Sequence, residues 1–188
     1  QQPDRSRRDA ETELSSVAAL AGKIQPVAQQ IGTNMYQPRT PGYSKHDAVQ
    51  RWHLPDRVFF ACGACHILAY AFMERYDAQN TQHYAPLWLK PASGFTGNHI
   101  VIAGTDWIFD YHGYRCRTSY MNHTFKRAQQ RWPGWQAEII TLTPDILVSE
   151  EKSRQIAGLW LREPGQFLHD ALPRARKFLD HFAPPPPR

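Results

Sequence analysis

A β-hairpin centred on Gly104 and Thr105 is the feature that most constrains how this chain can fold. The alternating segment HIVIA precedes the pair and DWIFDY follows it. A type II′ turn takes glycine at its first central position, so the pair predicts a two-residue turn. That turn would set His99 directly opposite Asp110 on one face, with the two Cβ atoms about 4.5 to 5.5 Å apart.

The opposite face of this hairpin is apolar, because Ile100, Ile102, Trp107 and Phe109 alternate with the polar pair. We expect these four residues in the core. A polar pair on a rigid, well-packed hairpin is a suitable support for a functional site. A three-residue turn would instead shift the register by one and move Asp110 to the apolar face.

Two cysteines lie three positions apart in the segment VFFACGACHILAYAF. The apolar run Val58–Ala61 predicts a short strand before them. From Cys65 onward, apolar residues recur at helical spacing, which predicts a helix to about Tyr76. Cys65 would therefore begin this helix, and Cys62 would lie just before it.

Three chemistries fit these cysteines. A strand, then Cys-x-x-Cys, then a helix is how thioredoxin-like proteins place a redox dithiol. Zinc would join Cys62 and Cys65 to His112 and Cys116, which have an acceptable His-x-x-x-Cys spacing. The third possibility is a cysteine nucleophile with a histidine base and an orienting carboxylate, both of which the hairpin supplies.

Cys65 is the better placed nucleophile, because the positive end of a helix dipole favours its thiolate. Its backbone N–H, after a flexible Gly-Ala approach, could serve as an oxyanion donor. Cys62 is expected to pack beneath it as a small hydrophobe. His112 is a rival base and Asp106 a rival orienting group, whereas His66 is expected to point away from the thiol.

The helix-leading GAC and the segments GNHIVI and WIFDYHGY together resemble the Cys-His-Asp order of the papain-like superfamily, particularly its transglutaminase-like branch. The similarity covers Phe59–Tyr114. It implies that Cys65 forms a thioester with an amide substrate, that His99 moves the proton and that Asp110 holds the imidazole. No glutamine lies a few residues before the cysteine, so the second oxyanion donor is unassigned. Peptidases, acyltransferases and glutamine-deamidating bacterial toxins or effectors belong to this branch.

Composition excludes several classes of protein. The net charge of +5 is scattered over the 188 residues, which does not favour nucleic-acid binding. No run of 18 apolar residues exists, so no membrane span is predicted. Three cysteines, an odd number, argue against a disulfide framework.

We expect an α+β fold in which an antiparallel sheet packs against the nucleophile-bearing helix. Residues 1–44 would form an arm with a helix over Asp9–Ile24, residues 45–183 the catalytic domain, and residues 184–188 a proline-rich tail. The other predicted elements are a short helix over Tyr43–Trp52, strands over residues 86–90 and Gln136–Leu142, and helices over Glu150–Arg162 and Gln166–Phe182.

The predicted function is a thiol-dependent amide hydrolase, a cysteine protease or protein glutamine deamidase, that uses Cys65, His99 and Asp110. We expect no cofactor and no metal, and a protein or peptide as substrate. The alternatives are acyl transfer by the same triad, a dithiol oxidoreductase and a zinc-stabilised binding module. The resemblance implies a toxin or effector that is secreted or delivered into a target cell as one biological setting.

Overall fold

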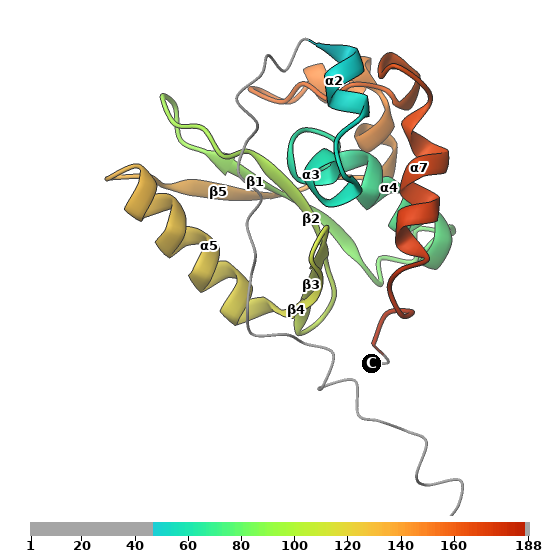
Figure 1. Cartoon of the computed structure of the whole chain (residues 1–188). Coiled ribbons are helices and arrows are strands. Elements are labelled where there is room, and N and C mark those ends of the chain that lie inside the picture. The colour runs from blue at the N-terminus through green and yellow to red at the C-terminus, as the bar shows by residue number, and fades with distance from the viewer. Residues whose placement is uncertain (1–46, 187–188) are drawn as a thin grey trace, which may run out of the picture. The chain divides into compact units, whose positions relative to one another are not determined.

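A computed structural model describes residues 47–186 as an α+β fold built on one antiparallel sheet. The expected arm over residues 1–44, with its helix, lies outside the described residues. Helices α3, α4 and α7 lie on one side of the sheet and α5 lies on the other (Figure 1). The predicted α+β class with an antiparallel sheet is therefore confirmed.

The sheet has five strands in the order β4-β3-β2-β1-β5, and every neighbouring pair is antiparallel. Four of the strands, β1, β2, β3 and β5, were predicted to within one residue at each end. The strand that the sequence did not reveal is β4. The bounds are β1 Ala85–Pro91, β2 His99–Ala103, β3 Trp107–Asp110, β4 Gly113–Cys116 and β5 Ala137–Thr141.

The register of the β2–β3 hairpin differs from the predicted one. Ala103 pairs with Ile108, and the Gly104 N–H donates to the Trp107 carbonyl at 2.9 Å, so the turn is formed by the two residues between them. The predicted turn was therefore wrong, and the register is displaced by two positions. Because side chains alternate with a period of two, His99 and Asp110 stay on the same face but are diagonal neighbours.

Gly104 is needed for space rather than for its backbone conformation. Its φ lies outside the positive region, unlike that of Gly63 and several other glycines. A Cβ at this position would lie 2.2 Å from Cε2 of Trp107. The indole therefore packs over the glycine, and this contact selects the turn.

The apolar face of the hairpin packs against α4, which spans Cys65–Tyr76 as predicted. The four residues expected in the core are buried there, and the Phe72 ring of α4 lies 4.8 Å from that of Phe109. The opposite face packs against Tyr120, the buried residue of α5 (Arg117–Arg131). The sequence prediction did not include α5.

Shorter helices surround α4. The predicted strand Val58–Ala61 is wrong, because these residues continue a helix that begins after Pro55. The helix predicted over Glu150–Arg162 is shorter than expected and ends at Arg154. Pro173 lies in the first turn of the last helix, where its missing N–H is tolerated. The bounds are α2 Ala48–Trp52, α3 Asp56–Ala61, α6 Glu150–Arg154 and α7 Ala171–Leu179, with 3₁₀ turns at Pro144–Val148 and Pro164–Gln166.

None of the helices in residues 47–186 combines the length and the apolar character needed to cross a membrane. The longest, α5, has 15 residues and carries several charges. A span of the hydrocarbon core takes about 20 apolar residues.

Candidate active site

Cys65 begins α4, directly after a tight loop that joins it to α3. Gly63 in this loop has a φ of +106°, which favours glycine, and a Cβ there would lie 2.4 Å from Nη2 of Arg51. The same Arg51 nitrogen donates to the Gly63 carbonyl at 2.8 Å. The buried arginine of α2 therefore holds the loop that presents the thiol.

Hydrogen bonding and charge from two histidines, His66 and His99, act on the Cys65 thiol. His66 was predicted to point away from the thiol, yet it takes part in this effect. Nε2 of His66 donates to the Arg162 carbonyl at 2.9 Å, since a carbonyl can only accept. This bond fixes the His66 ring and leaves its Nδ1 for the thiol.

His99, the first residue of β2, links the thiol to Asp110 at the end of β3. Its Nε2 donates to Oδ2 of Asp110 at 3.0 Å, and the two side chains are 14% and 1% exposed. With Nε2 committed to the carboxylate, Nδ1 remains for the bond with Cys65. The structure thus brings together all three residues that the sequence suggested, with each histidine nitrogen assigned one partner.

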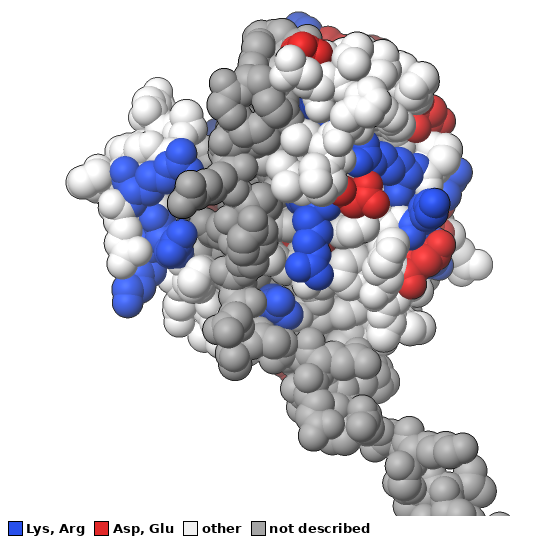
Figure 2. All heavy atoms as spheres, viewed as in Figure 1, with Lys and Arg blue, Asp and Glu red and all other residues white. Residues whose placement is uncertain are grey.

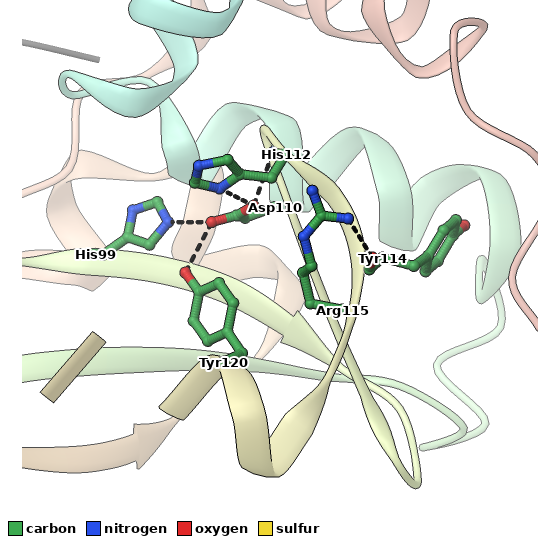
Figure 3. Close-up of polar contacts among 6 residues, drawn as sticks. All are labelled: His99, Asp110, His112, Tyr114, Arg115 and Tyr120. Atoms are coloured by element: carbon green, nitrogen blue, oxygen red, sulfur yellow. Dashed lines mark hydrogen bonds and ion pairs between the residues drawn. The ribbon is translucent and has the colours of Figure 1, made fainter. Parts of the chain in front are cut away.

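Asp110 accepts four hydrogen bonds, which matches the capacity of its two oxygens. Besides His99, Oδ2 accepts from the Tyr120 hydroxyl at 2.7 Å. Oδ1 accepts from the backbone N–H of His112 at 2.8 Å and from its Nδ1 at 3.0 Å. Figure 3 shows these side chains converging on the carboxylate from β2, the turn between β3 and β4, and α5. Although burial alone would raise the pKa of Asp110, these bonds and the histidine charges hold it well below its usual range.

The electrostatics favour an ionised pair of thiolate and imidazolium, here called the Cys–His pair. Burial alone would raise the Cys65 pKa, but the hydrogen bonds and charges of His66 and His99 lower it to about 5. Burial alone would lower the His99 pKa, but the bonds to Asp110 and Cys65 and their charges raise it to about 10. Between these two values the nucleophile is already deprotonated and the acid is already protonated.

An open cleft of about 200 Å³ lies beside His99, and α5 forms one wall of it. We call this space the α5 cleft. Tyr111 is one of its lining residues, with its ring edge-on to that of His99 at 5.5 Å between ring centres. The lining includes Asn98, His99, Tyr111, Tyr120, Arg127, Arg131, Trp132 and Trp135.

The other candidate residues occupy different positions. Cys62 caps the end of α3 and lines the α5 cleft, half-buried rather than packed beneath Cys65. His112 binds Asp110 and does not replace His99 as its partner on Oδ2. Asp106 is exposed in the hairpin turn, where it cannot orient His99.

The structure does not form the arrangements that the alternative chemistries need. The cysteines follow a helix and adjoin an antiparallel sheet, whereas the dithiol interpretation required a strand before them. Cys62, Cys65 and Cys116 form no disulfide with one another. Across residues 47–186, no three histidine, cysteine or acidic side chains are gathered in a way that could hold a metal ion. The four suggested zinc ligands are therefore not brought together.

Sequence reasoning missed Tyr120, the donor that joins α5 to the site. Tyr120, Thr124 and Ala128 recur every four residues and all line the α5 cleft. This spacing is the signal that could have revealed the helix.

Comparisons with protein-family models, with curated proteins and with solved structures give no match. The chemistry of the site is therefore inferred from its own residues.

Proposed function

We propose that this chain is a thiol-dependent amide hydrolase in which Cys65 is the nucleophile, His99 the acid and base, and Asp110 the orienting carboxylate. The observation that carries the proposal is the thiol at the start of α4 beside His99, whose Nε2 is bonded to a buried, fully bonded carboxylate. A charged Cys–His pair at a helix N-terminus is the state in which a thiolate attacks a carbonyl carbon.

The reaction follows from the placement of these groups. The Cys65 sulfur attacks the amide carbonyl, and the developing oxyanion can accept from the Cys65 backbone N–H, since the first N–H groups of a helix lack intrahelical partners. The imidazolium of His99 gives its Nδ1 proton to the leaving nitrogen as the C–N bond breaks. A water molecule, deprotonated by the same nitrogen, then cleaves the thioester and releases a carboxylic acid.

The chain order Cys-His-Asp and the helix that packs on an antiparallel sheet support a papain-like arrangement of the transglutaminase-like kind. Proteolysis and glutamine deamidation both proceed through a thioester on Cys65. They differ only in whether a backbone amide or a glutamine side-chain amide enters the cleft. The open α5 cleft beside His99 gives water access to the thioester. Hydrolysis is therefore the preferred outcome over transfer to an amine.

The experiment is incubation of the full chain with casein and with glutamine-containing peptides, followed by mass spectrometry. Cleaved peptides would indicate proteolysis, and conversion of glutamine to glutamate would indicate deamidation. The Cys65→Ala variant should lose both products. Cys116→Ala removes a free thiol at the end of β4, outside the triad, and should retain them. Equal products from wild type and Cys65→Ala would refute the proposal.

A further inference from the structure

We infer that the α5 cleft selects acidic polypeptide segments, so that aspartate or glutamate residues flank the amide that reacts. This inference rests on the proposed function and extends it to the class of substrate. It is carried by the charge of the cleft wall and by the position of that wall beside His99.

All the charged side chains of α5 are positive. The helix carries four cationic residues and no acidic one, and Figure 2 shows blue side chains gathered over it. Within the described part of the chain, none of the four forms an ion pair, whereas Arg75, Arg174 and Arg176 do. The four residues are Arg117, Lys126, Arg127 and Arg131.

Two of these cations, Arg127 and Arg131, line the α5 cleft, and no aspartate or glutamate among the described residues lines it. The charge of His99 is balanced by Asp110 and by the Cys65 thiolate, so the two arginines supply the positive charge of the cleft. The field also reaches His123, whose pKa is lowered by burial and by the charges of Arg127, His112 and Lys126. A cleft with cationic walls and no carboxylate favours an anionic occupant.

The α5 cleft is joined to the active site through Trp135. Trp135 Nε1 donates to the Thr96 carbonyl at 2.9 Å, in the loop that leads to His99. The Arg131 guanidinium lies 4.6 Å from the Trp132 ring, which positions its charge on the cleft wall. A polypeptide in the α5 cleft would contact Arg127, Arg131 and Trp132 while lying beside His99.

Guanidinium groups bind carboxylates through paired hydrogen bonds, and the partly exposed Trp132 ring adds apolar contact for neighbouring side chains. An acidic polypeptide supplies both kinds of contact together with the amide that Cys65 attacks. A nucleic acid would supply the charge but no amide in the backbone.

The first test is binding of a fluorescein-labelled oligoglutamate peptide to the full chain, measured by anisotropy. The double variant Arg127→Gln/Arg131→Gln should bind about tenfold more weakly, as expected for two lost ionic contacts. The matched control Arg117→Gln/Lys126→Gln removes the same charge from the same helix outside the cleft lining. It should bind within about twofold of wild type, because exposed charges away from the ligand are screened. Equal weakening in both variants would overturn the inference, and so would tighter, Arg127/Arg131-dependent binding of an RNA oligonucleotide of equal charge.

The second test uses a proteome-derived peptide library and records every cleaved or deamidated position by mass spectrometry. Acidic residues should be enriched around the reacted amide with wild type and with the control variant, and the enrichment should disappear with Arg127→Gln/Arg131→Gln. Products without acidic enrichment would overturn the inference while leaving the proposed function intact. Binding of oligoglutamate with no products beyond those of Cys65→Ala would instead contradict the proposed function.

Discussion

Replacement of His99 by alanine should slow the alkylation of Cys65 at acidic pH. With a pKa of about 5, roughly three quarters of Cys65 is thiolate at about pH 5.5, against roughly 0.1% of an ordinary thiol with a pKa near 8.5. A thiolate of lower pKa is a weaker nucleophile, and a Brønsted coefficient of about 0.45 offsets this gain by about 35-fold. Cys65 should therefore react about 20-fold faster than glutathione at this pH.

The His99→Ala variant loses a hydrogen bond and a positive charge beside the thiolate, while burial, which raises the thiol pKa, remains. The rate at about pH 5.5 should fall by about tenfold, and the midpoint of the pH profile should move upward. The assay follows iodoacetamide labelling from about pH 4 to 10 and assigns each cysteine by peptide mass spectrometry. Cys116 serves as the internal control, because its rate should be the same in both proteins. A labelling midpoint near pH 8.5 for Cys65 that is the same in wild type and in His99→Ala would refute the contact between Cys65 and His99.

Three further outcomes follow from the site and the hairpin. Asp110→Asn should keep the circular dichroism spectrum but lower turnover by about 10⁴-fold, because an amide cannot accept all four hydrogen bonds; full activity would remove Asp110 from the mechanism. The kcat/KM should be constant between about pH 5, below which the thiolate gains a proton, and about pH 10, above which the imidazolium loses one; a narrow optimum near neutrality would contradict the charged Cys–His pair. Gly104→Ala should lower the free energy of unfolding by about 1 to 3 kcal/mol in urea titrations, because its methyl group would enter the Trp107 ring. Gly165→Ala, which meets nothing within 4 Å, is the control and should change it little.

The sequence predicted the parts of the site that depend on local patterns. The apolar spacing after Cys65 located the start of α4, and strand alternation placed His99 and Asp110 on one face. The register was wrong because it depends on the contact between Trp107 and Gly104, which propensity rules do not include. His99 and Asp110 nevertheless lie on the same face, as predicted, because the register was displaced by an even number of residues.

Two other elements show where local patterns are insufficient. The run Val58–Ala61 is short and apolar, so its periodicity cannot distinguish a strand from a buried helical turn. Helix α5 is largely polar, with Tyr120 as its buried residue, and its place is set by one hydrogen bond to Asp110 and by its packing on the sheet. The hydrogen-bond donors to Asp110 could therefore be identified only from the structure.

The bond from Tyr120 to Asp110 makes the integrity of the site depend on a helix that is held mainly through one buried side chain. A helix with so few buried contacts is expected to detach locally at a lower free energy than global unfolding requires. Its detachment would remove a donor from the carboxylate and one wall of the cleft in the same event, while α4 and the sheet stay folded. Loss of activity on heating or in mild denaturant should therefore precede loss of the fold, and amide hydrogen exchange in α5 should follow the inactivation.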